Sequence, residues 1–592
     1  MKAVKTREDL SPADKWRPED LFASDGAWEA EYKEVLSEIP RLAAYKGILK
    51  NAKAVKGCMT LVTVLGSRAE MLHLYSHIRR DENTVADAYV RMSAKTGMLF
   101  KELFAASAFI DPELTALPAQ KLQAIADNKM LREHDYELKR LIAAKPHVLS
   151  ESEESILAQM SEFTGKFGEI FSVIDNAELG LPVIEVDGEK VQLTHGVYAK
   201  LLQHKDKAVR KLAFDGLYET FKKRNNTLAT TYSADVIKDI FYSRVRKYDN
   251  YLEKVLSAED VPAEVYFKLI SAVNGGLPAM HDYVALRKKL MGLDTLNMYD
   301  MYVPIVEGAE LSLKYKDAYK LVLEGLAPLG AEYNKLLKKA YKDGWIDVYE
   351  TENKRSGAYS TFAYNAPHPY VLLNYSATTH DVFTIAHELG HSMHSYYSAK
   401  FQPEPKASYK IFVAEVASTV NEMLLLEHLL RTTEDAGLKK FLLSYKLDSI
   451  RTTIFRQTMF SEFELKVHYM AETDEPLSAS VLNELYYELN KKYYGPSVEH
   501  DDYIKYEWSR IPHFYYSFYV YKYATGLTAA INIAESILSG GDAELKRYYD
   551  FLKAGGSKSP YEILRDAGVD LAADAPYIKL MDVFDKTLKE LS

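Results

Sequence analysis

Apolar side chains recur every three or four residues along most of this chain, which is the spacing of one face of an α-helix. Residues 151–171, 197–224 and 263–291 show the pattern clearly, with charged residues between the apolar ones and few prolines inside. A chain of this kind buries its apolar surface by packing helix against helix. The sequence therefore predicts a mainly α fold.

Strand-like runs are few and short. Residues 182–186 precede Asp187 and Gly188, a pair that favours a tight hairpin turn. Residues 345–349, 357–364 and 370–375 also have strand-like composition, and they stand directly before the segment that contains the clearest chemical motif. We expect a small sheet beside that segment.

The chain has 592 residues, which is more than one hydrophobic core usually supports. Two or more lobes that frame a cleft are therefore expected. The Asp187–Gly188 turn suggests a boundary near residue 190. It would separate an N-terminal helical domain, residues 1–190, from a longer domain, residues 191–592, that contains every candidate catalytic and metal-binding residue described below.

Composition narrows the class of partner. The chain is 47% hydrophobic and 27% charged, which is ordinary for a soluble globular protein. Its net charge of -10 argues against nucleic acid, because phosphate backbones are bound by basic surfaces. No run approaches the ~18 apolar residues of a membrane span, so no membrane partner is expected. The sequence does not indicate an oligomeric state.

The cellular compartment is suggested by the first residues and by cysteine use. Residues 1–17 are charged and lack the apolar core of a secretory signal. Cys58 is the only cysteine, so no internal disulfide can form and a reducing compartment fits. Its apolar neighbours predict a buried structural role for Cys58. The expected localisation is cytoplasmic.

The clearest motif is His387-Glu388-Leu389-Gly390-His391, within a run of helical apolar spacing. Two histidines four residues apart lie on one helix face and can converge on a single zinc ion. Glu388 is rotated about a quarter turn from His387, so its carboxylate can reach a water beside the metal without binding the metal itself. The alternative is a pair of structural histidines.

A catalytic zinc site needs a third protein ligand and an open position. A third histidine on the same helix would require glycine at 394 and histidine at 397, but the chain has His394 and Tyr397. A carboxylate from a second helix is the remaining source. We expect residues 412–424 to form this second helix. Glu415 lies in a long apolar stretch of it, and a metal ion would offset the cost of placing its carboxylate there.

Two further acids are candidates for supporting the ligands. Glu422 falls two turns after Glu415, so it can accept a hydrogen bond from the far nitrogen of a metal-bound imidazole, although an ordinary exposed glutamate explains it equally well. Asp381, at the start of the His387 helix, has the same ambiguity, because a capping role would account for it.

With these positions assigned, the sequence resembles the oligoendopeptidase F group of the thimet oligopeptidase family of zinc peptidases. The resemblance runs over nearly the whole chain and includes Lys15 to Phe22, Asp175 to Leu179 and Tyr299 to Pro304. Its most specific parts are residues 387–394 and 412–418. It implies one Zn²⁺ per chain held by His387, His391 and Glu415, with Glu388 as the general base.

The resemblance implies two more groups of functional residues. Gly357, Ala358 and Tyr359 correspond to a strand that lies along bound peptide, where backbone groups pair with the substrate. Tyr359 stands where many relatives carry phenylalanine, which changes only a side chain. His513, Tyr516 and Tyr523 fall in the family's histidine and tyrosine segment, which faces the zinc and stabilises the oxyanion.

The fold implied by the resemblance is a helical, two-lobed ellipsoid around a deep channel that admits only short peptides. The implied reaction is hydrolysis of internal peptide bonds by a zinc-activated water, with Glu388 as base. Two alternatives remain. An exopeptidase would need a group that captures a peptide terminus, and no residue can be assigned that role. A non-catalytic peptide-binding protein would gain nothing from the general base Glu388.

Overall fold

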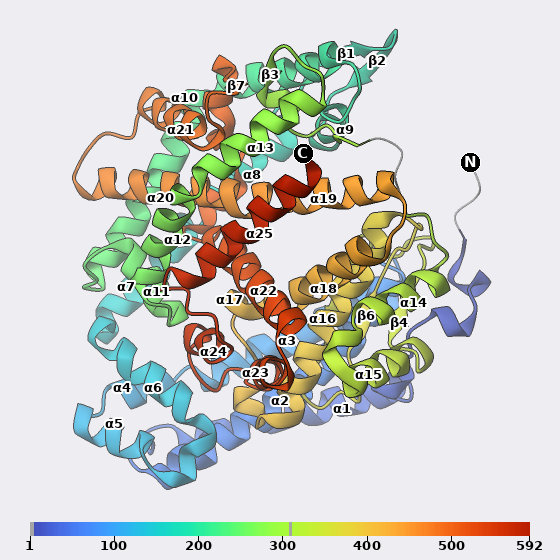
Figure 1. Cartoon of the computed structure of the whole chain (residues 1–592). Helices are drawn as coiled ribbons and strands as arrows, with labels where there is room; N and C mark the ends of the chain where they lie inside the picture. The colour runs from blue at the N-terminus through green and yellow to red at the C-terminus, as the bar shows by residue number, and fades with distance from the viewer. Residues whose placement is uncertain (1–4, 307–310) are drawn as a thin grey trace. The chain divides into compact units, whose positions relative to one another are not determined.

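Helices account for most of the chain in the computed structural model, which describes residues 5–306 and 311–592 (Figure 1). The strands within these residues are short and form three small sheets. The prediction of a mainly α fold is therefore confirmed. In the described part of the chain, no helix has both the length and the apolar character that crossing a membrane requires.

The chain forms two compact units, each built from three segments. The first unit comprises Met1–Pro146, Glu310–Arg431 and Ile533–Val569, and the second comprises His147–Ala309, Thr432–Asn532 and Asp570–Ser592. Two units agree with the lobes expected from the chain length. The chain passes between them after residues 146, 309, 431, 532 and 569. The domain boundary predicted near residue 190 is not one of these points and stays a prediction.

The first unit begins with a helical layer whose core lies between its long helices. Trp28 on α1 is fully buried, and its indole N–H donates to the carbonyl of Leu72 on α2 at 2.9 Å. Leu99 on α3 joins the same apolar cluster. The helices of this segment are Asp25–Glu38 (α1), Ala52–Glu82 (α2), Asp87–Ser107 (α3), Ile110–Thr115 (α4), Ala119–Ala126 (α5) and Asp135–Ala144 (α6).

The three strand-like runs predicted before the His387 helix form one sheet in the first unit, as expected. Its strand order is β4-β6-β5, with β4 (Ile346–Asp347) parallel and β5 (Tyr359–Thr361) antiparallel to β6 (Tyr370–Leu372). The sheet lies beside α16, so it is a neighbour of the motif helix. The other helices of this unit are Tyr315–Gly325 (α14), Gly330–Lys342 (α15), Thr379–Phe401 (α16), Ile411–Ala414 (α17), Val416–Thr432 (α18), Asp542–Leu552 (α23) and Pro560–Asp566 (α24).

The predicted hairpin is the two-stranded sheet of the second unit formed by Val183–Val186 (β1) and Glu189–Gln192 (β2). Asp187 and Gly188 make the turn with φ values of 53° and 81°. Both values are positive, as the tight turn that matches strand twist requires. A second pair in this unit, Leu296–Asn297 (β3) and Val498–Glu499 (β7), is parallel.

The long helical runs predicted in the second unit are present but interrupted. The run at 151–171 breaks at Gly165, and the run at 263–291 breaks at Gly276, where an added Cβ would lie 2.4 Å from the sulfur of Met581. The helices are Glu151–Thr164 (α7), Lys166–Val173 (α8), His195–Leu201 (α9), Lys207–Val245 (α10), Tyr251–Glu259 (α11), Ala263–Gly275 (α12), Leu277–Leu290 (α13), Ala436–Ile450 (α19), Arg456–Glu472 (α20), Ala479–Tyr494 (α21), Tyr521–Ser539 (α22) and Ala575–Leu591 (α25), of which α22 continues into the first unit.

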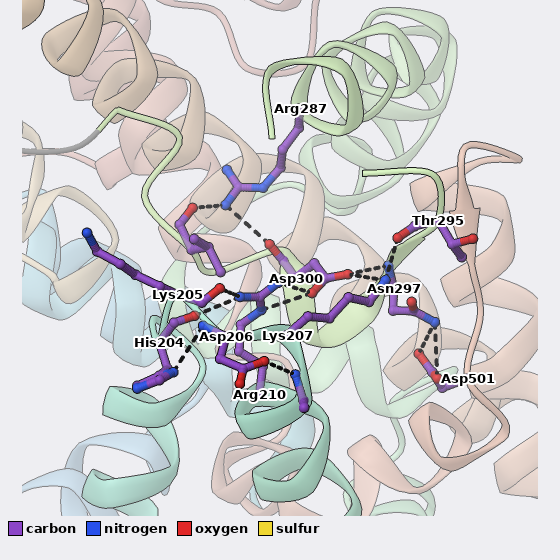
Figure 2. A network of polar contacts seen from close by, with 12 residues as sticks. His204, Lys205, Asp206, Lys207, Arg210, Arg287, Thr295, Asn297, Asp300 and Asp501 are labelled. Carbon is purple, nitrogen blue, oxygen red and sulfur yellow. Dashed lines mark hydrogen bonds and ion pairs between the residues drawn. The ribbon is translucent and has the colours of Figure 1, made fainter. Parts of the chain in front are cut away.

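A buried ion-pair network anchors the 299–304 segment within the second unit. Figure 2 shows Asp300 facing Arg210 and Lys207. Its Oδ1 accepts from Arg210 Nε at 2.9 Å and Nη2 at 2.7 Å, and its Oδ2 accepts from the backbone N–H of Asn297 at 2.9 Å. Asp300 is 0% and Arg210 2% exposed. Both oxygens of the Asp300 carboxylate therefore accept hydrogen bonds, and the charge of Asp300 balances that of the buried Arg210.

Replacing Asp300 with asparagine is expected to destabilise the second unit by about 3–5 kcal/mol, because the positive charge of Arg210 stays buried without its partner. Urea unfolding followed by tryptophan fluorescence measures the effect. Asp215→Asn on α10, the helix that carries Arg210, is the control, since Asp215 pairs with Lys211 at the surface, where an ion pair contributes about 0–1 kcal/mol. Equal unfolding curves for the two variants would contradict the role given to Asp300.

Candidate metal centre

Helix α16 begins where the sequence places its start signal. Thr378 is the N-cap, and its side chain accepts from the backbone N–H of Asp381 at 3.2 Å. The Asp381 side chain accepts in turn, because its Oδ2 binds the backbone N–H of Thr378 at 2.9 Å and that of Ser376 at 3.0 Å. Asp381 therefore completes a capping box. It stands six residues, about 9 Å along the helix axis, before His387. Of the two roles considered for Asp381, capping of the helix is therefore the one that its contacts support.

The two histidines of the motif and Glu415 converge in the first unit. The Nε2 atoms of His387 and His391 are 3.1 Å apart, and each lies 3.3 Å from Oε2 of Glu415. These three side chains form a group that can hold a metal ion within the described residues. The structure thus brings together the three residues that the sequence and the resemblance named as candidate ligands.

The distances between the three atoms fit a tetrahedral ion. Ligand atoms about 2.05 Å from a tetrahedral zinc ion are separated by about 3.3 Å, so the observed separations need little change on binding. Two imidazole nitrogens and one carboxylate oxygen are also a donor set that zinc prefers. The residues present therefore fit a zinc ion.

Glu415 reaches the site from a different local structure than predicted. The expected continuous helix over residues 412–424 is wrong, because α17 ends at Ala414, Glu415 follows it, and α18 starts at Val416. The Glu415 side chain is 49% exposed, so the cost of burial assumed in the sequence argument is smaller than expected. Its distances to the two imidazoles, rather than its apolar neighbours, identify it as a candidate ligand.

Glu422 on α18 contacts the far side of the His387 ring. Its Oε1 lies 2.5 Å from His387 Nδ1, so that nitrogen donates the hydrogen bond and Nε2 is left to face Glu415. Of the two roles predicted for Glu422, the contact with the imidazole is the one that the geometry supports. Asp381, the other acid considered for this supporting role, makes its hydrogen bonds at the start of α16.

Two carboxylates influence the charge of the His387 imidazole. Burial lowers the pKa of His387, but hydrogen bonds to Glu415 and Glu422 outweigh it and raise that pKa to about 10. Burial also opposes ionisation of Glu415, yet hydrogen bonds from His387 and His391 hold its pKa well below the usual range. The two carboxylates thus favour the protonated form of His387 in the metal-free site.

Glu388 is buried beside the candidate ligands. It is 6% exposed, and its Oε2 has no hydrogen-bond partner among the described residues. Burial raises its pKa, and the nearby imidazoles of His387 and His391 partly offset that rise. A buried carboxylate oxygen without a partner is costly unless water or a ligand completes the site.

Gly390 allows α16 to cross the start of α18 at close range. A Cβ at this position would lie 2.5 Å from Ser418 Cα and 2.6 Å from the carbonyl oxygen of Ala417. Near this crossing, the Asn421 amide on α18 donates to the carbonyl of Ala386 on α16 at 2.9 Å. Sequence reasoning missed this role. The signal was a glycine inside a helix, which is unfavourable unless packing requires it.

His394 is excluded as a ligand, as the motif analysis predicted. It is 1% exposed, and its ring stacks on Tyr409 with centroids 3.8 Å apart and lies 4.9 Å from Phe551. Burial lowers its pKa to about 3, so it is neutral at physiological pH. His394 is a core histidine of the first unit.

Strand β5 lies at the edge of its sheet and is fixed to α16. The hydroxyl oxygens of Ser360 and Ser392 are 2.8 Å apart, which joins the strand to the residue after His391. The hydroxyl of Tyr359 donates to Asp81 Oδ2 on α2 at 2.6 Å, so this side chain is held within the fold. Gly357, with a φ of 85°, and Ala358 lead into the strand.

His513, Tyr516 and Tyr523 belong to the second unit. His513 Nε2 and the Tyr523 hydroxyl lie 3.2 Å apart and form a pair, and burial lowers the pKa of His513. Tyr516 is 70% exposed and is not part of this pair. The structure therefore brings two of the three residues together, and their roles stay predictions.

Two family models match this chain. The model for peptidase family M3 matches residues 200–583, which include every candidate ligand, and the model for oligopeptidase F matches residues 113–180. Together they span most of the sequence.

Relatives and solved structures agree with these matches. Oligopeptidase PepF of Bacillus subtilis (strain 168) is 43% identical over 99% of this chain and 88% of its own length, and group B oligopeptidase PepB of Streptococcus agalactiae is 38% identical over 97% and 96%. A crystal structure from Chlamydophila abortus has a TM-score of 0.95 at 32% identity, covering 100% of this chain and 99% of that one. The crystal structure of oligoendopeptidase-F from Enterococcus faecium has a TM-score of 0.73 at 34% identity, covering 96% and 98%.

Proposed function

Since the chain belongs to peptidase family M3, we propose that it is a zinc-dependent endopeptidase that hydrolyses internal bonds of short peptides. The observation that carries this proposal is the arrangement of three candidate ligand atoms, 3.1 to 3.3 Å apart, beside Oε2 of Glu388, which has no hydrogen-bond partner among the described residues. A structural metal site has no use for a free buried carboxylate next to its ligands.

His387, His391 and Glu415 would hold the ion, and Glu422 would orient His387 through its Nδ1 proton. When bound, Zn²⁺ polarises a peptide carbonyl and lowers the pKa of water toward about 7. The ligand atoms come from α16 and from the junction between α17 and α18. Close packing of these elements at Gly390 therefore sets the size of the site.

Glu388 would move the protons. Its Oε2 accepts a proton from the attacking water and then donates it to the nitrogen of the departing amine. Burial supports this role, because it raises the carboxyl pKa toward the pH at which the proton must be taken up and released. The reaction needs no covalent intermediate between enzyme and peptide.

The backbone of Gly357, Ala358 and Tyr359 would pair with the peptide substrate. The position of β5 at the sheet edge supports this role, since an edge strand has backbone groups that can accept another strand. Tyr359 would act through its backbone, because its hydroxyl is already bonded to Asp81. Peptides N-methylated next to the cleaved bond should therefore be poorer substrates, and equal cleavage would contradict strand pairing.

Zinc affinity is expected to rise about tenfold or more for each pH unit between pH 6 and 8. His387 binds a proton below pH about 10 in the metal-free site, and zinc can bind only after that proton leaves. Lower pH therefore favours the proton, and higher pH favours the metal. Competition with a chelator at three pH values, corrected for protonation of the chelator, measures the change. A constant affinity would contradict the protonation assigned to His387.

The test of the proposed function combines metal analysis with mass spectrometry of the products from a mixed peptide pool. One zinc ion per chain and internal cleavage of peptides with blocked ends are expected. Cleavage of free-ended peptides alone would replace the endopeptidase with an exopeptidase. Zinc binding without cleavage would favour a peptide-binding protein.

The remaining predictions concern partners, location and the oxyanion. Short peptides are the proposed substrates, and a cytoplasmic location stays a prediction from the first residues and the single cysteine. His513 and Tyr523, with Tyr516 as a further candidate, are proposed as donors to the developing oxyanion. The hydrogen-bonded pair within the second unit supports the first two.

A further inference from the structure

An unusual turn separates His513 from Tyr523 in the second unit. Residues Pro512–Tyr516 form a short 3-10 helix, and α22 begins at Tyr521. Between them, Phe518 has a φ of 55°, in the left-handed region that bulky residues rarely adopt. Phe518 is also fully buried. Such a conformation persists only where the surrounding structure holds it.

Two buried acids on different helices hold this turn. The hydroxyl of Ser517 donates to Asp239 Oδ2 on α10, and the backbone N–H of Phe518 donates to Glu464 Oε1 on α20 at 2.9 Å. Asp239 is 2% and Glu464 0% exposed. The turn is therefore attached on both sides to long helices of the second unit.

Aromatic rings enclose the Phe518 side chain. Its ring centroid lies 4.6 Å from that of His468, 5.5 Å from that of Tyr266 and 6.1 Å from that of Tyr251. His468 stands one turn after Glu464 on α20, and its Nε2 is 3.6 Å from Asp239 Oδ2. Asp239 thus contacts both the turn, through Ser517, and His468 in the wall of its pocket, while the backbone carbonyl of Glu464 lies 2.9 Å from His468 Nδ1.

Burying the carboxyl groups of Asp239 and Glu464 costs free energy. Burial raises the pKa of Glu464 to about 8, and its Oε2 has no hydrogen-bond partner among the described residues. An apolar side chain of similar volume would avoid this cost. The specific contribution of Glu464 is an acceptor for the Phe518 amide, and that of Asp239 is an acceptor for Ser517.

His513 and Tyr523 are each five residues from Phe518, on opposite sides of the turn, and their polar atoms meet at 3.2 Å. The turn therefore connects the two segments that carry the pair. We propose that Asp239 and Glu464 are positioning residues that hold the Ser517–Phe518 turn and thereby keep His513 and Tyr523 paired for the reaction. This inference rests on the proposed function and on the donor role assigned to that pair.

Replacing Glu464 with methionine removes the acceptor, whereas glutamine keeps an oxygen that can accept from Phe518. Glu464→Met is expected to lower kcat by about 10- to 100-fold, as misplaced catalytic groups do, with KM and zinc content nearly unchanged. Glu464→Gln should stay within about threefold of the parent protein. Equal losses in the two variants would overturn the proposal. Ser517→Ala tests the Asp239 contact without changing a buried carboxyl, and full kcat in this variant would overturn the Asp239 part.

A mutant cycle separates positioning from general stability. In a Tyr523→Phe background the pair is already broken, so Glu464→Met should then cost less than about threefold in kcat. The same cost in both backgrounds would show that Glu464 acts elsewhere and would overturn the proposal.

Hydrogen exchange tests the turn without any activity measurement. Amides of residues 514–523 should exchange at least about tenfold faster in Glu464→Met and at the parent rate in Glu464→Gln. Unchanged exchange in Glu464→Met would overturn the anchoring role of Glu464. If the zinc-loaded parent protein does not cleave peptides, the proposed function fails, and the positioning role fails with it even where the exchange result holds.

Discussion

Replacing Glu388 with glutamine is expected to lower kcat by a factor of about 10² to 10⁴, while the chain keeps one zinc ion. Glutamine has nearly the same shape as glutamate, and Glu388 is not one of the three residues whose side chains converge as candidate ligands. The variant therefore keeps the metal group but loses the only buried carboxylate oxygen at the site without a hydrogen-bond partner among the described residues. Steady-state hydrolysis of an internally quenched peptide, with zinc content measured on the same sample, checks both parts.

Glu102→Gln is the control for this prediction, because Glu102 is an exposed residue on α3 of the same unit. It should hydrolyse the peptide at the parent rate. If Glu388→Gln keeps more than about a tenth of the parent kcat, another group must take the proton from water. If it loses zinc instead, Glu388 contributes to holding the ion.

Replacing Gly390 with alanine is expected to abolish zinc retention, although Gly390 contributes no ligand. The new Cβ would lie 2.5 Å from Ser418 Cα and 2.6 Å from the Ala417 carbonyl oxygen. These are backbone atoms and cannot rotate away, so α16 and the start of α18 must separate. Overpacking of this kind costs about 1–3 kcal/mol or more. Because Glu415 directly precedes α18, the same separation moves a ligand away from His387 and His391.

Gly97→Ala provides a matched control for that prediction. Gly97 is an exposed position within α3, and an added Cβ there meets no atom within 4 Å. Alanine at Gly97 should leave zinc content unchanged and stabilise the helix by about 0.5–1 kcal/mol. Metal analysis and thermal unfolding measure both variants. Normal zinc content in Gly390→Ala would show that the helices can separate without opening the site.

The local parts of the site were accessible from the sequence. His387, Glu388 and His391 lie within one turn of a helix, so their mutual arrangement follows from helix geometry once the apolar spacing predicts that helix. The small sheet before this helix and the Asp187–Gly188 hairpin were predicted for the same reason, since each depends on residues close together in the chain. Asp381 shows the limit, because its capping and supporting roles have the same sequence signature.

Contacts between elements could not be derived in this way. Glu415 was assigned by its apolar neighbours and by resemblance, yet its carboxylate is half-exposed and follows a short helix instead of lying inside a long one. The contact between Glu422 and His387 was one of two open alternatives. Gly390 was overlooked, because its neighbours Ala417 and Ser418 are distant in sequence and adjacent only where two helices cross.

The sequence by itself determined the helical character of the chain, the histidine pair with its adjacent acid, and the family. Each of these follows from spacing within a few residues or from similarity along the whole chain. Only the tertiary structure decided how three separate segments build each unit, how closely α16 and α18 approach, and how Asp239 and Glu464 hold the turn at Phe518. These features depend on side-chain volume and hydrogen-bond geometry between residues that meet only after folding, and periodicity along a chain does not encode such distances.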